Sequence, residues 1–164
     1  MSDPVDLHQS SADLIESRKR LVAQLFERII TLGELDLADE IFAEDFHWPQ
    51  FDLHGPDGVR AWVVNFRRAF PDVDDRVVEQ VSEGDVVFTR VRVTGTQLGP
   101  WLGTPPSGRR ADFTALGIDR FRGDKVVERT ALFDVTDVMR QLGHESLPIL
   151  PSARQSVTVT DLDT

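Results

Sequence analysis

The spacing of apolar residues changes once along the chain, near Arg76, from a helical to an alternating pattern. Before this point apolar residues recur every three or four positions, as between Leu14 and Leu32 and between Val59 and Phe70. After it, VVEQVSEGDVVFTRVRVTGTQ alternates with period two on both sides of Glu83-Gly84-Asp85. Helical spacing predicts amphipathic helices, and alternation predicts half-buried strands. Three helices followed by antiparallel hairpins predict an α+β domain.

The boundaries of this domain follow from its flanks and loops. Residues 1–11 are predicted to be a disordered lead and 151–164 a disordered polar tail, so 12–150 form a single domain. A short second helix, LDLADEIF, precedes the segment 45–54, which is predicted to be irregular because Pro49 argues against a central strand. A strongly bent sheet wrapped on the helices would leave an internal pocket, a natural site for a small molecule.

Composition excludes several classes of partner and chemistry. The net charge is −10, which argues against nucleic acid and anionic membranes as partners. No apolar run approaches the roughly 20 residues that span a bilayer, and the N-terminus lacks the features of a signal peptide, so a cytoplasmic location is expected. The chain has no cysteine and no tyrosine, which removes thiolate and phenol chemistry.

Motifs for metals and cofactors are absent from the sequence. The four histidines show neither H-x-x-x-H nor H-E-x-x-H spacing, and there are no thiols to complete a zinc site. Neither G-x-G-x-x-G nor a P-loop occurs. We therefore expect no tightly bound metal or nucleotide cofactor.

Several segments carry a resemblance to a known family. They include GPDGVRAWVVNFRRAFPD, VRVTGTQLGPWLGTPPSGRR and RQLG, and the G-x-P-P-x-x-R-R loop at 103–110 is the most specific of them. Over residues 21–143 the chain resembles the SnoaL-like polyketide cyclase and hydroxylase group of the NTF2-like superfamily. The resemblance implies an NTF2-like cone, in which three N-terminal helices pack on a strongly curved antiparallel sheet around a deep apolar pocket. It also implies a homodimer or homotetramer formed through the outer face of the sheet.

The family's catalytic residues do not all carry over to this chain. The cyclases of the group close a ring by a cofactor-free intramolecular aldol reaction, in which a carboxylate takes a proton from carbon. The resemblance matches the cyclase aspartate to Ala131, the cyclase histidine to Gly117 and its polar neighbour to Ala115. Asp134 is a nearby carboxylate, but it would need a β-bulge to face the pocket, because an odd offset on a strand reverses the face.

Three residues are the candidates for catalysis. If Ala131 faces the pocket, alternation places Arg129 there, and Asp119 lies on the inner face of the neighbouring strand. Asp119 would then be the base and Arg129 would hold an enolate or carboxylate, although a reversed face would make both of them surface charges. His47 is the third candidate because its intrinsic pKa suits proton transfer near neutral pH. His54 and Asp52 could join His47.

The predicted substrate-binding residues are aromatic or small, which suits a flat aromatic ligand. They are Trp48, Trp62, Phe66, Trp101, Phe113, Ala115, Gly117, Ala131 and Phe133.

The resemblance and these residues together favour a tailoring enzyme of aromatic polyketide and antibiotic biosynthesis. The first hypothesis is an acid–base cyclase or isomerase that acts on a hydrophobic aromatic substrate. The second is a hydroxylase of the same family that inserts oxygen, with a reductase as a possible partner. The third is a binder without catalysis, which a pocket lined only by apolar side chains would favour.

Overall fold

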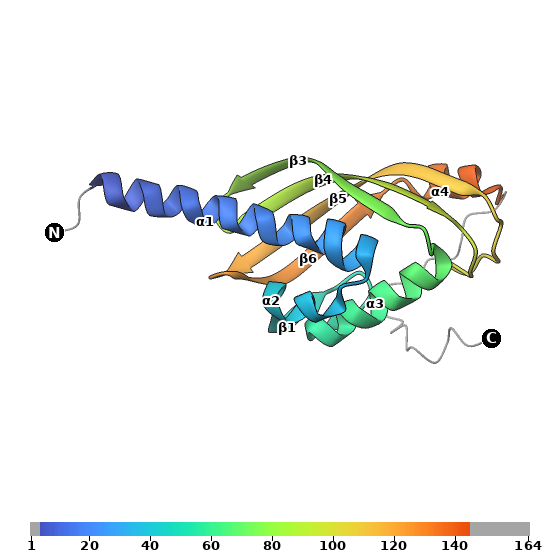
Figure 1. Ribbon diagram of the computed structural model, residues 1–164, viewed down its shortest axis with the longest axis horizontal. Helices are drawn as coiled ribbons and strands as arrows, with labels where there is room; N and C mark the ends of the chain where they lie inside the picture. The colour runs from blue at the N-terminus through green and yellow to red at the C-terminus, as the bar shows by residue number, and fades with distance from the viewer. Residues whose placement is uncertain (1–3, 145–164) are drawn as a thin grey trace.

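Six strands form one curved sheet, and α1 and α3 lie across its concave side (Figure 1). The computed structural model describes the backbone of residues 4–144 and the side chains of residues 11–144. The strand order is β2-β1-β6-β5-β4-β3. The helices are α1 (Pro4–Gln24), η1 (Leu25–Ile30), η2 (Leu35–Leu37), α2 (Ala38–Ile41), α3 (Gly55–Ala69) and α4 (Val135–Leu142), and the strands are β1 (Phe42–Trp48), β2 (Leu53–His54), β3 (Asp74–Glu83), β4 (Val86–Thr96), β5 (Arg110–Arg122) and β6 (Lys125–Phe133).

The two predicted hairpins are confirmed, and they form most of the sheet. β3 pairs with β4, β4 with β5 and β5 with β6, all antiparallel. β1 pairs with β6 in parallel, so the sheet is mixed rather than antiparallel throughout. The α+β fold with a curved sheet is thus as expected, with one parallel strand pair that the alternating pattern did not indicate.

The prediction of an irregular segment over residues 45–54 was wrong. β1 ends at Trp48, and β2 returns at Leu53 as its antiparallel partner. Pro49 lies in the turn between the two strands, where it removes no ladder hydrogen bond. The proline therefore marks the end of a strand and not the absence of one.

The helices follow the predicted pattern with shifted ends. α1 begins at Pro4, within the segment predicted to be a disordered lead, and it continues into the π-helical segment η1. The second helix is shorter than expected and ends at Ile41, because Phe42 already starts β1. α3 begins at Gly55 and ends before Pro71, as its flanking residues predict. The predicted tail, 151–164, lies outside the described residues.

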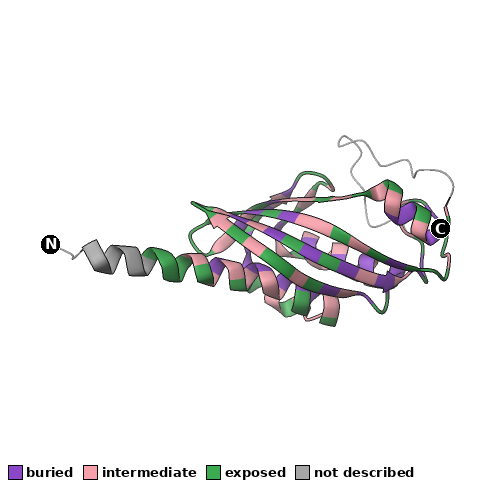
Figure 2. Cartoon of the chain, turned by 90° about the horizontal axis from the view of Figure 1, so that it is seen from above, coloured by how far each residue is buried: buried purple, intermediate pink, exposed green. Residues whose placement is uncertain are grey.

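The core lies between the helices and the inner face of the sheet. On β4, Val87, Val91 and Val93 are buried, whereas Arg90 and Arg92 are exposed, and the strands in Figure 2 show the same alternation of buried and exposed positions. Arg18 of α1 is itself buried. It donates to the carbonyl oxygens of Gly84 and Gly123, each at 3.0 Å from one of its nitrogens. These bonds attach α1 to both hairpin turns.

Candidate active site in the concave sheet

A buried ion pair lies on the inner face of the sheet. Asp119 and Arg129 are opposite residues of β5 and β6, and their side chains are 0% and 3% exposed. Nη1 of Arg129 donates to both carboxylate oxygens of Asp119, at 2.7 and 2.9 Å. Burial raises the pKa of Asp119, and the charge and hydrogen bonds of Arg129 oppose that rise. The structure therefore brings together two of the three catalytic candidates and turns them inward.

Aromatic rings hold the guanidinium group of Arg129 in place. Its Cζ lies 4.8 Å from the ring centre of Phe26 and 5.3 Å from that of Trp48, both distances at which cation–π attraction operates. Gly117 makes room for it, since a Cβ there would lie 2.8 Å from Nη2. Nε of Arg129 is buried and has no hydrogen-bond partner among the described residues. Nη1 thus donates to Asp119, while the Nε–H of Arg129 is used by no described residue.

A third buried charged group, Asp75, faces the same interior. The residue is 3% exposed, and its Oδ1 has no hydrogen-bond partner among the described residues. Burial raises the pKa of Asp75 from 3.8 to about 7, although the positive charge of Arg129 opposes this rise. A buried polar group without a partner is rare in folded proteins. Asp75 therefore has the two properties of a general base near neutral pH, a free oxygen and a matched pKa.

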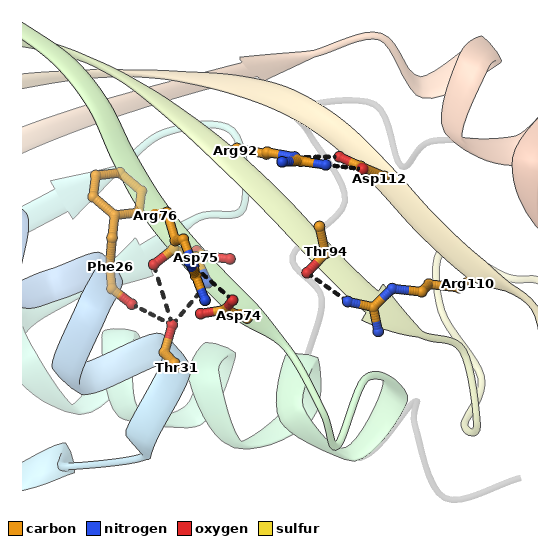
Figure 3. A network of polar contacts seen from close by, with 9 residues as sticks. All are labelled: Phe26, Thr31, Asp74, Asp75, Arg76, Arg92, Thr94, Arg110 and Asp112. Carbon is orange, nitrogen blue, oxygen red and sulfur yellow. Dashed lines mark hydrogen bonds and ion pairs between the residues drawn. The ribbon is translucent and has the colours of Figure 1, made fainter.

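The π-helical segment η1 links Asp75 to Phe26. The hydroxyl of Thr31 donates to the carbonyl oxygen of Phe26 at 3.0 Å and accepts from the backbone N–H of Asp75 at 2.8 Å (Figure 3). π-Helical turns are rare and occur frequently at functional sites. This one places the ring that contacts Arg129 and anchors the backbone of Asp75.

The predicted aromatic residues form one continuous wall beside these charges. Trp62 lies 5.1 Å from Trp48 and 5.0 Å from Phe66 between ring centres, and Phe66 lies 6.1 Å from Trp101. Trp101 stacks on Phe133 at 5.9 Å, and Phe113 follows at 5.4 Å from Phe133. The chain of rings thus runs from β1 through α3 and the 97–109 loop to β5 and β6. Trp62, Trp101, Phe113 and Phe133 are only partly buried.

The three small residues predicted for the pocket lie beside the ion pair. Gly117 and Ala131 are opposite residues on β5 and β6, and Ala115 is opposite Phe133. The amide of Gln50 binds the backbone of Ala131, accepting from its N–H at 2.7 Å and donating to its carbonyl oxygen at 2.6 Å. Position 131, which the resemblance matches to the cyclase aspartate, is an alanine and carries no titratable group. Asp134 does not replace it, since its side chain caps α4 by accepting from the N–H of Asp137 at 2.9 Å.

A closed pocket inside the sheet stays a prediction. Two hollows at the described residues, of about 520 and 700 Å³, lie elsewhere. The smaller is beside β1 and the β5–β6 turn, and the larger is on the arginine-bearing outer face of β4.

His47, the third catalytic candidate, is not brought to this interior. Successive side chains of a strand face opposite ways, and Trp48 is the neighbour that contacts Arg129. His47 instead stacks on His54, with ring centres 4.4 Å apart and an angle of 9° between the planes. Asp52 lies beside both rings. His54 and Asp52, which the sequence analysis allowed as neighbours of His47, thus lie beside it on the other face of β1.

Asp75 is the residue that the sequence analysis missed. The pattern that could have indicated it is Val73, Asp75 and Val77, which alternate along one face at the start of β3. An acidic residue on an otherwise apolar strand face has no solvent to hydrate its charge. A buried acidic residue of this kind is expected either to have a charged or hydrogen-bonding partner or to take part in function.

Comparisons with known proteins were made on the sequence and on the fold. A family model described as SnoaL-like polyketide cyclase matches residues 20–142. A search of curated proteins returned no match. Among the described residues, no helix has the length and apolar character needed to cross a membrane.

Three solved structures illustrate the structural similarity. IdmH of Streptomyces antibioticus, a proposed polyketide cyclase, is 28% identical, with a TM-score of 0.65 over 77% of this chain and 98% of IdmH. AclR of Streptomyces galilaeus, a proposed hydroxylase, is 23% identical, with a TM-score of 0.68 over 82% of this chain and 87% of AclR. A protein of Catenulispora acidiphila with a ketosteroid isomerase-like fold is 15% identical, with a TM-score of 0.63 over 76% and 92%.

The last two similarities concern the fold alone, and they agree with the curved sheet and its covering helices. The family match extends from the C-terminal end of α1 to the end of α4, and so it includes every described strand and the buried residues Asp75, Asp119 and Arg129. The chain belongs to the SnoaL-like polyketide cyclase family.

Proposed function

We propose that this protein is a polyketide cyclase or isomerase in which Asp75 is the general base and Arg129 stabilises the enolate. The observation that carries the proposal is the unpartnered, buried carboxylate of Asp75 in the same interior as a buried arginine with a free Nε–H. Titratable groups whose pKa is strongly shifted by burial and that face a ligand-accessible interior are frequent at active sites. The family supports a polyketide as the substrate class.

The proposed reaction moves one proton and forms one carbon–carbon bond. The Asp75 carboxylate takes a proton from a carbon next to a substrate carbonyl, and the resulting enolate oxygen accepts a hydrogen bond from Arg129. The enolate carbon then attacks a second carbonyl of the same molecule. The alkoxide that forms takes the proton back from Asp75, so the product has the mass of the substrate. An isomerisation uses the same first step and returns the proton to another carbon.

Asp119 acts in this proposal through Arg129. Because both of its oxygens accept from Nη1, its lone pairs are less available to a substrate than those of Asp75. The pair fixes the guanidinium so that its Nε side faces away from Asp119. Preorganised donors of this kind stabilise developing negative charge more than mobile ones, because they need no reorientation during the reaction.

The test is a conversion assay with a panel of anthraquinone-type polyketide esters, followed by liquid chromatography with mass detection. We expect a product of unchanged mass. Asp75→Asn should lower the rate by about 10²–10⁴-fold, the usual contribution of a general base. Asp74→Asn is the matched control, because Asp74 is the partly exposed neighbour that pairs with Arg76 (Figure 3). It should retain the rate.

Three outcomes would overturn the proposal. A product that has gained one oxygen atom would make the protein a hydroxylase. Binding of the panel without conversion, seen as a rise in melting temperature, would make it a binder. Full activity of Asp75→Asn would assign the base to another residue, and Asp119→Asn would then be the next variant to compare.

A homodimer through the outer face of the sheet is also part of the proposal. Exposed apolar side chains gather on that face from β3, β5 and β6, namely Val78, Val81, Ile118 and Leu132. Their exposed fractions are between 37% and 57%. Ile118→Lys places a charge on this face. In sedimentation experiments the wild type should be a dimer, and this variant should be a monomer. A monomeric wild type would contradict this part.

A further inference from the structure

The β1–β2 hairpin gathers two imidazoles and one carboxylate that the proposed reaction does not use. His47 and His54 are opposite residues in the antiparallel register of the hairpin, and Asp52 lies in the turn before β2. Oδ1 of Asp52 is 3.2 Å from Nε2 of His54 and 3.7 Å from Nε2 of His47. One ligand atom from each of the three residues lies within 4.8 Å of the other two.

The nitrogen of His47 that faces this cluster has no partner of its own. Its Nε2 is a buried atom, and it makes no hydrogen bond to any described residue. A neutral imidazole nitrogen without its proton carries a lone pair, which is the usual donor to a transition metal. The stacking of the two rings brings both Nε2 atoms to the same carboxylate oxygen, and a cation between them would use all three donors.

We propose that His47, His54 and Asp52 bind one divalent transition-metal ion of the Zn²⁺ type. Ligand atoms at about 2.0 Å from a tetrahedral ion stand about 3.3 Å from one another. The contact from Asp52 to His54 already has this length, and the contact from Asp52 to His47 is within half an ångström of it. The side chains are 41%, 66% and 50% exposed, so small rotations meet little resistance and the ion has access from solvent.

The donor set selects the kind of ion. Two imidazoles and one carboxylate suit Zn²⁺, Ni²⁺, Cu²⁺ and Fe²⁺, whereas Ca²⁺ and Mg²⁺ prefer oxygen ligands throughout. Three protein ligands leave at least one coordination position open. Glu128 is paired with His47 in the register of the adjacent strand β6 and is exposed, so it is the acidic residue that the backbone places next to the cluster. Water fills the position if Glu128 does not.

The sequence spacing did not indicate this site. The seven-residue interval between His47 and His54 fits no helical metal motif, but in a hairpin it makes them direct neighbours. Their side chains lie on the face of β1 opposite to Trp48 and thus away from Asp75 and Arg129. The inference therefore does not depend on the proposed function.

The test is a calorimetric titration of the full chain, without an affinity tag and freed of metal by a chelator, with ZnCl₂ alone. We expect one ion per chain with micromolar or tighter affinity at pH 7.5. His54→Gln and Asp52→Asn should each weaken binding at least tenfold. Both positions are exposed, and asparagine tolerates the positive φ of 51° at residue 52, so both variants should fold.

His144→Gln is the matched control. His144 lies away from the hairpin, with its Nε2 3.1 Å from Oε1 of Gln97, and its removal should leave the affinity unchanged. Co²⁺ in place of Zn²⁺ should give a visible absorption band that is lost in His54→Gln. Binding only at millimolar Zn²⁺, or binding as tight as that of the wild type in both His47→Gln and His54→Gln, would overturn the proposal.

Discussion

Replacement of Asp75 by asparagine should stabilise the folded protein, and the gain should increase with pH. Asp75 is 3% exposed, and burial raises its pKa from 3.8 to about 7. Below pH 3.8 the carboxyl is protonated in both the folded and the unfolded chain. Between these two pH values the unfolded chain releases the proton while the folded chain keeps it, so the folded state loses stability relative to the unfolded state.

The size of this loss follows from the pKa difference. A rise from 3.8 to about 7 corresponds to about 4 kcal/mol of lost stability once the pH exceeds 7. Asparagine has nearly the same shape and no charge at any pH, so its variant lacks this pH-dependent loss. For a chain of this length the difference amounts to roughly 8–16 °C in melting temperature. The gain would accompany a loss of catalytic rate, as expected when a strained active-site group is removed.

Urea denaturation of the wild type and of Asp75→Asn at pH 4.5, 6, 7.5 and 9 measures this difference directly. The difference in the free energy of unfolding should grow up to about pH 7 and then stay constant, with similar slopes against urea. Effects of other titrating groups cancel because they are common to both proteins. A difference that does not vary with pH would refute the reasoning, since it would mean that Asp75 is ionised in the folded state at its ordinary pKa.

Further predictions concern the rest of the interior. Asp119→Leu or Arg129→Met alone should each cost about 3–5 kcal/mol in urea denaturation, whereas the double variant should recover most of this cost, because it leaves no lone buried charge. If the two single costs simply add in the double variant, the pair is not coupled. Gly117→Ala places a Cβ 2.8 Å from Nη2 of Arg129 and should destabilise by about 1–3 kcal/mol, and unchanged stability would contradict this packing. Trp101→Ala should weaken binding of an anthraquinone ligand, measured by fluorescence titration, by at least tenfold, since its indole stacks on Phe133 at the partly exposed end of the wall. Equal affinity would place the ligand elsewhere.

The spacing of apolar residues predicted helices and strands well where one face of the element is buried. The period-two alternation after Arg76 indicated β4, and in the structure this strand buries Val87, Val91 and Val93 and exposes Arg90 and Arg92. The rule for proline failed around Pro49, because the residue lies one position beyond the strand. The start of α1 at Pro4 was also missed, since few apolar residues mark that end of the helix.

The sequence predicted one part of the candidate site and missed another. Alternation placed Asp119 and Arg129 on a face with Ala131, and their opposition in the register confirms that they share it. Which face was inner depended on the helices that cover the sheet. Asp75 was overlooked because its pKa depends on burial that accumulates from β3, η1 and β4 together.

The class of fold, the family and the residues that alternation brings to one face of a strand could all be read from the sequence. These properties depend on patterns within ten or twenty residues, because the backbone geometry of a helix or strand fixes the direction in which each side chain points. The packing of distant segments buries Asp75, leaves the Nε–H of Arg129 without a partner among the described residues, and brings His47 against His54 across a hairpin. Desolvation and contact between distant segments are properties of the packed chain, and no local pattern contains them.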